Sequence, residues 1–437
     1  MTKRLNSVAA AVLALTIPMA AQATNGMQLE GYGPIAAGMG GVSMALNNGV
    51  AASANNPATL RLMATSARLD LAIGHLGPDV QLSAGPMASK SGGTSYTMPA
   101  FGYARRSGDW VYGVGVFAQG GMGTEFGADS FMAMGSGKPV RSELGVGRAI
   151  LPLAYKASQQ LTLGGSVDLV WSTLDLRMAA SGAQLGQMVT GATGNLAQAL
   201  PALGGAPWAR IDFSDGTEYS GEAWSRGWAA KLGFHYKLSD ELSVGGAWHS
   251  RTHLSDMKTS PGGASMSAMG GFADSGSLRV LDFQMPAQTA LGVAWQATPS
   301  LMVAADVKRI AWKGVMDMLR MRYDSAGMGG SVSFGLPQQW KDQTVTAIGL
   351  AWSATPALTL RAGYNHASNP IPDLFVNPLF PATVEKHYTA GLSLKFGESS
   401  EVSAALSKSP AARVVSGSGV GISHAQLNGQ LMISIGF

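Results

Sequence analysis

From Thr65 onward, the chain divides into segments of roughly ten residues in which apolar and polar side chains alternate. The segment at residues 425–437 shows this most clearly. Its two faces carry Leu427, Leu431, Ile433, Ile435 and Phe437 on one side and Gln426, Asn428, Gln430 and Ser434 on the other. Successive side chains of a strand point to opposite faces. The pattern therefore predicts strands with one apolar face and one wet face, which is typical of transmembrane β-strands.

Fourteen such segments can be marked along the chain. They cover residues 65–76, 96–106, 110–119, 144–156, 160–177, 226–238, 241–254, 278–296, 300–312, 340–354, 357–367, 384–397, 399–409 and 425–437. An even number of strands allows a closed bacterial barrel with both chain ends on one side. We therefore predict an all-β fold, a transmembrane antiparallel β-barrel of 14 strands over residues 65–437.

The connections between these segments alternate in length. Tight turns are predicted at residues 106–109, 157–159, 238–241, 297–299, 354–356 and 397–399, and every connection between them is long. Outer-membrane barrels show this alternation because their periplasmic turns are short and their extracellular loops are long. A soluble β-sandwich also has short alternating strands, but it has no reason to alternate loop length and would expose more charge.

The first 23 residues indicate the cellular compartment of the protein. Lys3 and Arg4 precede an apolar run from Val8 to Ala21, and Ala21-Gln22-Ala23 is a small-x-small cleavage site. These features indicate a signal peptide at residues 1–23. We expect a protein of the bacterial outer membrane with both termini on the periplasmic side.

Composition excludes several classes of protein. The chain has no cysteine, which rules out disulfides and thiolate metal sites. Without Lys3 and Arg4, 28 of the 30 basic residues remain against 26 acidic ones, and such a balance argues against a nucleic-acid partner. Charged residues are 13% of the chain, yet no apolar run after the leader approaches the roughly 20 residues of a membrane-spanning helix.

No constellation of catalytic residues is recognisable. His249 and His253 are four residues apart, which on a strand separates them by roughly 13 Å, too far to share a metal ion. Neither a Gly-x-Ser-x-Gly motif nor a phosphate-binding loop occurs. We predict that the protein is not an enzyme and has no cofactor and no metal.

The tract GMGGVSMALNNGVAASANNPATL, residues 38–60, matches neither a helix nor a strand. Small residues allow close packing, and asparagine side chains can satisfy main-chain groups that lack a ladder partner. Pro57 restricts Asn56 to extended or turn conformations. The tract could be a plug that fills a barrel lumen or a linker into the first strand.

Several motifs resemble the FadL family of outer-membrane transporters for long-chain fatty acids and aromatic hydrocarbons (OMPP1/FadL/TodX type). They are Gly26-Met27-Gln28-Leu29, Asn56-Pro57-Ala58, Thr124-Glu125-Phe126, MPAQTALGVAWQATPSLMVAADVKRIAW and WKDQTVTAIGLAWSATPALTLRAGYNHASNPIPD. The resemblance covers the whole mature chain. It implies a 14-stranded barrel whose N-terminal residues, 24–64, form a hatch inside the lumen, with Asn56, Pro57 and Ala58 as part of that hatch.

The resemblance also implies a lateral opening in the third strand, where Gly121 corresponds to the kink. Glycine tolerates irregular dihedral angles and leaves space for an opening. Gly113, Gly115, Gly120 and Gly123 are close rivals, and glycine used only for close packing is the alternative.

Two long loops concentrate flexible apolar side chains that suit ligand capture. One carries Phe126, Phe131, Met132 and Met134. The other, residues 179–210, carries Leu185, Met188 and Val189 and then Leu196, Leu200 and Leu203 at spacings that predict an amphipathic helical excursion. A hydrophobic groove between these loops would bind ligand, unless these residues only hold the loops together.

A fatty-acid carboxylate would bind a cation, and arginine offers a planar donor fork. Arg177 and Arg320 lie near the basic head-group positions of the family, with Arg322, Arg279 and Lys308 as rivals. Ordinary ion pairing in the lumen is the alternative.

We therefore predict passive uptake of hydrophobic compounds, most of all long-chain fatty acids, with lateral release into the membrane. The alternatives are uptake of aromatic hydrocarbons and a general aqueous porin. The expected partners are these ligands, outer-membrane lipids and lipopolysaccharide, and the barrel assembly machinery, which would recognise Phe437 as a C-terminal signal.

Overall fold

The computed structural model describes residues 25–217 and 220–437, so the predicted signal peptide, residues 1–23, lies outside the described residues. The chain begins with three short helical elements, α2 (Pro34–Ala37), η1 (Gly49–Ser53) and η2 (Pro57–Leu62). Asn56 caps η2, because its side-chain oxygen accepts a hydrogen bond from Ala58 N at 3.1 Å. Pro57 occupies the first helical position, where its missing N–H costs nothing.

The remaining elements are strands, two α-helices and three further 3₁₀ turns. They are β1 (Ala67–Ala84), β2 (Met87–Lys90), β3 (Tyr96–Ser107), β4 (Trp110–Phe126), η3 (Phe131–Ala133), β5 (Val140–Lys156), β6 (Leu161–Ala180), α3 (Gly182–Met188), β7 (Val189–Thr193), α4 (Gly194–Leu203), β8 (Ala209–Phe213), β9 (Ala223–Lys237), β10 (Leu242–His249), β11 (His253–Leu254), β12 (Met257–Lys258), β13 (Ala264–Ala268), β14 (Phe272–Leu281), β15 (Gln288–Thr298), β16 (Leu301–Ile310), η4 (Trp312–Gly314), β17 (Met318–Ser325), β18 (Ser331–Pro337), β19 (Gln343–Ser353), β20 (Leu358–Ala367), η5 (Asp373–Phe375), β21 (Lys386–Phe396), β22 (Ser400–Val415) and β23 (Gly421–Gly436).

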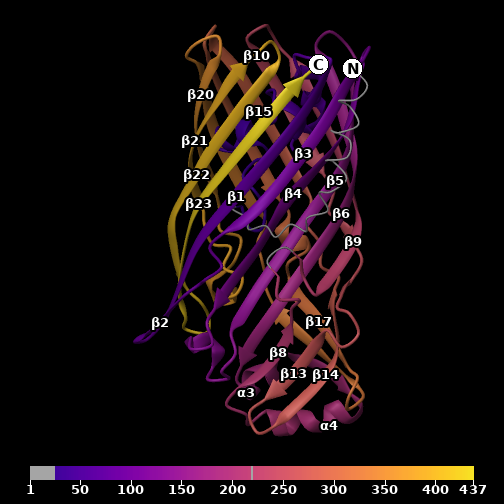
Figure 1. Ribbon diagram of the computed structural model, residues 1–437, viewed down its shortest axis with the longest axis vertical. Helices are drawn as coiled ribbons and strands as arrows, with labels where there is room; N and C mark the ends of the chain where they lie inside the picture. The colour runs from indigo at the N-terminus through magenta and orange to yellow at the C-terminus, as the bar shows by residue number, and fades with distance from the viewer. Residues whose placement is uncertain (1–24, 218–219) are drawn as a thin grey trace.

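The long strands form a closed antiparallel ring. It runs from β1 through β3–β6, β9, β10, β15, β16 and β19–β23, and β23 pairs back with β1 from Arg68↔Gly436 to Ser83↔Gly421. Closure removes the free edges that an open sheet would expose. The C-terminus lies at the end of the tight turns, and α3 and α4 lie at the opposite end (Figure 1).

The prediction of a fold with 14 strands is wrong, because the sheet contains 23 strands within the described residues. Two predicted strands are divided: residues 241–254 become β10 and β11, and residues 278–296 become β14 and β15. Seven further strands, β2, β7, β8, β12, β13, β17 and β18, lie in segments predicted as loops. Strands this short carry too little alternation to be distinguished from loops. Several of them also pair with distant segments, such as β18 with β7.

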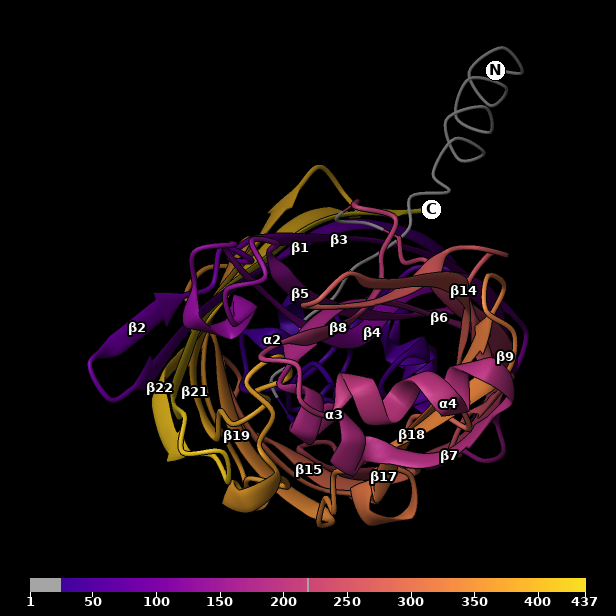
Figure 2. The ribbon, with the colours of Figure 1, turned by 90° about the horizontal axis from the view of Figure 1, so that it is seen from below.

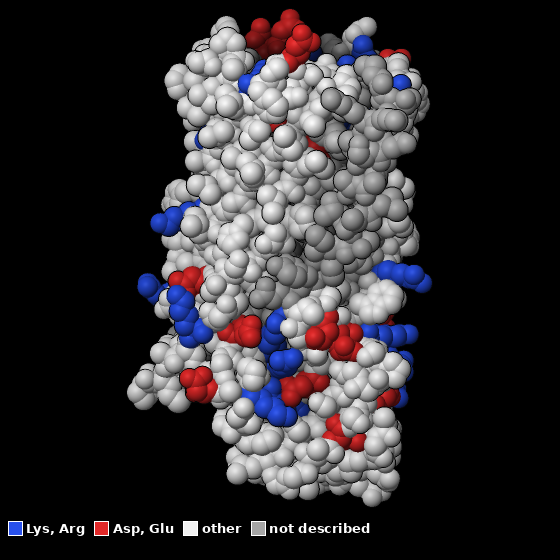
Figure 3. Space-filling view, viewed as in Figure 1, with Lys and Arg blue, Asp and Glu red and all other residues white. Residues whose placement is uncertain are grey.

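The wall has an apolar outer face and a polar inner face. Leu232, Leu291, Val307, Leu406 and Leu427 are exposed on the ring strands, whereas Asp168, Lys231, Asn365 and His387 are buried. Figure 3 shows a broad middle zone with few charged side chains, and Lys, Arg, Asp and Glu gather toward the two ends. Such a belt is the surface that a barrel presents to lipid. Among the described residues, no helix is both long enough and apolar enough to span a membrane.

The predicted helical excursion within residues 179–210 is confirmed, although a strand divides it. A capping box at Ser181 and Gln184 starts α3, and β7 separates α3 from α4. Leu185, Leu196 and Leu203 turn their side chains into a hydrophobic cluster. Seen from the loop end, the two helices lie across the mouth of the ring (Figure 2).

The segment from Asn25 to Met63 packs within the ring. Its helix α2 contacts β21, β22 and β23, whereas η2 contacts β5, β6 and β9, which lie elsewhere around the wall. Figure 2 likewise shows α2 inside the circle of strands. Small residues permit these contacts: Gly40, at φ 72°, lies directly against the main chain of Tyr364.

Candidate functional site

The wall is interrupted between β3 and β4. In the described part of the chain, the ladder between these strands runs from Ser107↔Trp110 to Phe101↔Val116 and ends there. Strand β3 continues along β1, and β4 continues along β5 to Phe126↔Val140. A β-bulge lies in β4 just beyond this point, where the register with β5 shifts between Ala118 and Gly120. The bulge bends β4 away from β3 and leaves an interval in the wall, which we call the β3–β4 gap.

Leu29 of the N-terminal segment lies against the β3–β4 gap. Its side chain is buried in a cluster with Tyr96 and Met98 of β3 and Ala118 of β4. Its N–H donates to Gln119 O, the carbonyl of the bulge, at 3.4 Å. A Cβ on Gly120 would collide with the Met27 carbonyl, so glycine is needed for this close approach.

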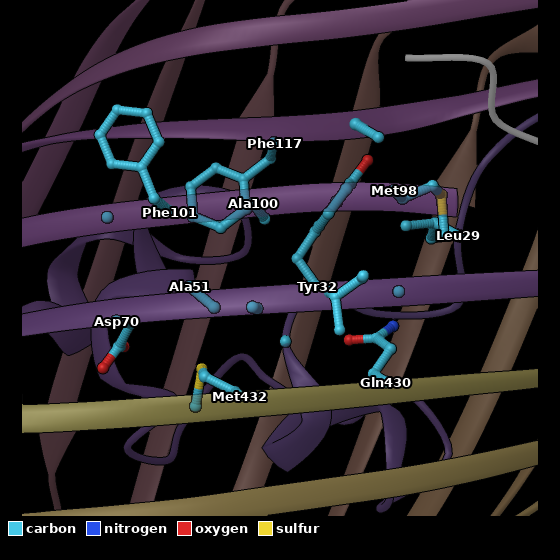
Figure 4. Close-up of a pocket in the computed structure, with 16 residues that line it drawn as sticks. Leu29, Tyr32, Ala51, Asp70, Met98, Ala100, Phe101, Phe117, Gln430 and Met432 are labelled. Carbon is cyan, nitrogen blue, oxygen red and sulfur yellow. The ribbon is translucent and has the colours of Figure 1, made fainter. Parts of the chain in front are cut away.

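A pocket adjoins the β3–β4 gap on the inner side of the wall (Figure 4). Its cavity volume is about 40 Å³, and it is partly open to its surroundings. Its lining is mainly apolar and aromatic; the large apolar or aromatic members are Leu29, Tyr32, Ile73, Met98, Phe101, Phe117 and Met432. The rings of Tyr32 and Phe117 meet edge to face, with centroids 6.4 Å apart. Asp70 also lines this pocket, but its carboxylate is bound by Arg68 Nε at 2.7 Å and Val50 N at 2.8 Å.

A buried ion triad lies beside the bulge, inside the ring. Arg148 Nη1 and Lys231 Nζ both contact Asp168 Oδ2, the former at 2.8 Å. Ser166 donates a further hydrogen bond to Asp168 Oδ1 at 2.7 Å. Arg148 Nε in turn donates to the side-chain oxygen of Gln119. The single carboxylate of Asp168 therefore pairs with both cations, and Arg148 holds the bulge residue from the inner side.

The apolar residues predicted for ligand capture do come together. Phe126 and Leu185 are buried in one hydrophobic cluster, and Phe131, Met132 and Met188 pack against it half-buried. The cluster also contains Met27, so it extends from the loops to the N-terminal segment. Met134 is half-buried and ends η3 in the left-handed region at φ 52°, and it is not among the residues of this cluster.

The two predicted head-group arginines do not come together. Arg177 alternates along β6 with Leu176 and Met178, which are buried in the inner cluster, so its side chain lies on the opposite face. Arg320 is exposed beside the buried Met321 on β17, again on the outer face.

The other three basic candidates, Arg279, Arg322 and Lys308, do not all come together either. Arg279 and Arg322 share the carboxylate of Asp324 at 3.3 and 2.8 Å and are partly exposed. Of the five basic candidates, only Lys308 reaches the N-terminal segment, where Nζ donates to Glu30 O at 3.4 Å. The structure therefore offers no cluster of these cations on the lumen side.

The predicted hatch residues are deeply buried. Asn56 Nδ2 donates to Met44 O at 2.7 Å and to Phe234 O at 2.9 Å, so it joins two parts of the N-terminal segment to β9. Pro57 and Ala58 approach Gly164 of β6 so closely that a Cβ there would collide with them. Gly121 lies two residues beyond the bulge at Gln119 and pairs in register with Gly145.

Sequence reasoning missed the triad and the bulge residue. Arg148 and Asp168 are charged residues within otherwise apolar segments, which is a signal for an inward charge. Nothing in the sequence indicates that these two residues and Lys231 meet, because the pairing depends on strand register.

Outside the ring, burial raises the pKa of Tyr323, whose hydroxyl donates to Asp274 Oδ2 at 2.8 Å.

Comparisons with known proteins agree with this geometry. The family model described as outer membrane protein transport protein (OMPP1/FadL/TodX) matches residues 10–418. The crystal structure of the toluene transporter TodX of Pseudomonas putida superposes with a TM-score of 0.85 at 32% identity, covering 93% of this chain and 99% of that one. The toluene transporter TbuX of Ralstonia pickettii superposes with a TM-score of 0.79 at 28% identity, covering 93% of this chain and 99% of that one.

Two further likenesses carry less information. A FadL homologue of Pseudomonas aeruginosa has a TM-score of 0.72 at 14% identity, over 94% of this chain and 98% of that one, and so supports the fold alone. An uncharacterized protein from the 5′ region of the phosphoenolpyruvate carboxykinase gene of Chlorobium limicola is 41% identical over 87 residues. That match spans 20% of this chain and 43% of the relative, less than half its length.

Proposed function

The chain belongs to the outer membrane protein transport protein family (OMPP1/FadL/TodX), and from that premise we propose that it takes up monoaromatic hydrocarbons. It is a β-barrel of the bacterial outer membrane, a channel for hydrophobic compounds and not an enzyme. The choice of an aromatic substrate is supported by the two toluene transporters, at 32% and 28% identity over 93% of the chain.

The observation that carries this choice is the placement of the arginines. A fatty acid would bring a carboxylate into the channel, and a buried carboxylate needs a cation or several hydrogen-bond donors. Arg177 and Arg320 lie on the outer face of the sheet. The buried Arg148 and Lys231 already bind Asp168, and Lys308 donates to the main-chain oxygen of Glu30. A neutral aromatic ring needs no such partner and fits the apolar lining of Leu29, Met98 and Phe117. The fatty-acid prediction therefore gives way to its aromatic alternative.

The route we propose has three parts. Ligand first enters the hydrophobic cluster of Phe126 and Leu185 at the mouth. It then passes the N-terminal segment, which acts as the hatch held by Asn56. Finally it leaves sideways through the β3–β4 gap, near Gly121 and at the bulge of Gln119. Transport along this route is passive, because burial of apolar surface alone, about 25 cal/mol per Å², favours movement from water into the lipid.

Uptake by whole cells tests the proposal. We expect cells that produce the protein in a strain without related channels to take up radiolabelled toluene several-fold faster than cells with an empty vector. Uptake of radiolabelled oleate should not change. Faster oleate uptake without a toluene effect would restore the fatty-acid prediction, and a large stable ion conductance in planar bilayers would favour an aqueous porin.

A further inference from the structure

We infer that Leu29 and Tyr32 form a gate at the β3–β4 gap and that the main-chain carbonyl of Gln119 is its latch. The inference rests on the proposed function, since it concerns the last step of the proposed route. It assigns the step to particular residues and to one hydrogen-bond acceptor. It also explains how an aromatic ligand could open the gate.

The first part of the gate is Leu29. Its side chain occupies the place where a strand neighbour would otherwise continue the wall, in contact with Met98 on one side and Ala118 on the other. At 6% exposure it leaves little room for a ligand to pass. Passage from the pocket to the lipid therefore requires that Leu29 withdraw.

The latch is the carbonyl oxygen of Gln119. The Leu29 N–H donates to it at 3.4 Å and the Tyr32 hydroxyl at 2.9 Å. A carbonyl has two lone pairs and can accept both bonds. The bulge frees this carbonyl for the N-terminal segment, because an inserted residue is left out of the ladder. One backbone atom of the wall thus holds both gate residues.

The latch point is fixed from behind by the ion triad. Arg148 binds the Gln119 side chain and is held by Asp168, which also binds Lys231. These three residues lie on β5, β6 and β9. The ion triad therefore holds the Gln119 carbonyl in place on the wall, and the N-terminal segment is the part that moves.

The main chain of Tyr32 is also fixed, which limits what can move. The side chain of Asn55 accepts from Tyr32 N at 3.2 Å and donates to Tyr32 O at 2.9 Å, and His249 Nε2 contacts Asn55 O at 2.8 Å. Gly31 lies between Tyr32 and the segment that contains Leu29. Opening therefore combines rotation of the Tyr32 side chain with displacement of residues 27–29 about this glycine.

The aromatic contact supplies the trigger. Tyr32 and Phe117 line both the pocket at the β3–β4 gap and a smaller cavity that faces Arg148, Lys231 and His249. A ligand ring can replace Tyr32 in its edge-to-face contact with Phe117, because any aromatic ring offers the same edge and face. The exchange moves Tyr32 off the Gln119 carbonyl. An aliphatic chain lacks this contact, so the gate selects aromatic ligands.

A single-atom substitution tests the latch. Tyr32→Phe keeps the ring and removes one of the two hydrogen bonds, which should favour the open gate and raise the initial rate of toluene uptake about two- to tenfold. Tyr236→Phe is the matched control, because that hydroxyl bonds Gln160 Oε1 at 3.0 Å in an exposed position at a tight turn. An unchanged rate for Tyr32→Phe at equal amounts of folded barrel would contradict the latch.

A reversible cross-link tests the gate itself, since the chain has no cysteine of its own. Leu29→Cys with Ala118→Cys should oxidise to a disulfide that holds Leu29 in the gap. Toluene uptake should then fall at least fivefold and recover with a reductant. Leu360→Cys with Leu392→Cys, at paired and exposed positions on β20 and β21, is the control and should leave uptake unchanged when oxidised.

The outcomes separate the two proposals. If the natural chain takes up toluene and the oxidised pair does so at the same rate, the gate is wrong and the proposed function stands. Failure of the pair to oxidise would contradict the contact between Leu29 and Ala118. If the natural chain does not increase toluene uptake, the proposed function fails, whatever the variants do.

Discussion

Arg148 Nη1 lies 2.8 Å from Asp168 Oδ2 on neighbouring strands inside the barrel, with side chains 4% and 0% exposed. Lys231 contacts the same carboxylate oxygen. A single carboxylate therefore pairs with two buried cations beside the bulge of β4. Removing one member of a buried ion pair leaves uncompensated charge, which costs far more than the pair itself contributes.

Asp168→Asn should strongly destabilise the barrel. The variant leaves Arg148 and Lys231 next to each other without a counter-charge, at a cost of about 3–5 kcal/mol in the free energy of unfolding. Urea unfolding in detergent micelles, followed by tryptophan fluorescence, measures the change. Asp240→Asn is the control, because Asp240 pairs with Lys237 at an exposed turn and should not alter the transition. Equal changes in the free energy of unfolding for the two variants would show that the triad matters no more to stability than an exposed ion pair does.

Arg177→Gln combined with Arg320→Gln should leave toluene uptake unchanged. Both side chains lie on the outer face of the sheet and away from the hydrophobic cluster. Phe126→Ala, by contrast, removes a fully buried ring from that cluster and should slow uptake at equal barrel levels. Initial rates of radiolabelled toluene uptake measure both effects. A pronounced loss in the double arginine variant would place a charged site on the route after all.

Asn56→Ala should loosen the N-terminal segment within the barrel. The substitution removes the hydrogen bonds to Met44 O and Phe234 O and leaves both carbonyls without that donor, at a cost of about 1–3 kcal/mol. We expect more frequent brief openings in single-channel recordings. Asn47→Ala is the control, since Asn47 is exposed and bonds only a nearby main-chain N–H, Gly49 N, among the contacts described. Identical recordings for both variants would argue against Asn56 as an anchor.

Gly120→Ala should displace the N-terminal residues from the β3–β4 gap. A Cβ at this position collides with the Met27 carbonyl, and main chain cannot move aside as a flexible side chain can. We expect faster hydrogen exchange at the Leu29 amide, observed by mass spectrometry of the N-terminal peptide. Gly429→Ala on β23 is the control, because its nearest neighbour is Leu406 Cδ2 at an ordinary 3.5 Å. Unchanged protection of Leu29 would show that the segment is not held at Gly120.

Part of the fold follows from local pattern. Alternation in residues 425–437 predicts β23 to within a few residues, and the spacing of Leu185, Leu196 and Leu203 predicts the helices at the mouth. The total of 14 strands that this pattern predicts is wrong. Strands such as β8 and β13 are short. They are stabilised by pairing with each other and, respectively, with β6 and β14, which local periodicity does not reveal.

The candidate site was predictable only in part. Phe126, Phe131 and Met132 were identified because large apolar side chains in a long loop need an explanation, and the structure gathers them with Leu185. The family resemblance predicts Arg177 and Arg320 from their positions along the chain, and a shift of one residue on a strand turns a side chain to the other face. Tyr32 and Gln119 gave no signal, since neither belongs to a motif.

The sequence by itself determined the alternation of the wall strands and the small-residue tract, and it predicts an export signal, because each depends on residues that are close in the chain. Only the tertiary structure decided that the β3–β4 ladder ends at Val116, that Leu29 and Tyr32 meet the carbonyl of Gln119, and that Asp168 serves two cations. These features join segments 20 to 90 residues apart. Their formation depends on the register of each strand and on the path of the N-terminal segment inside the closed ring.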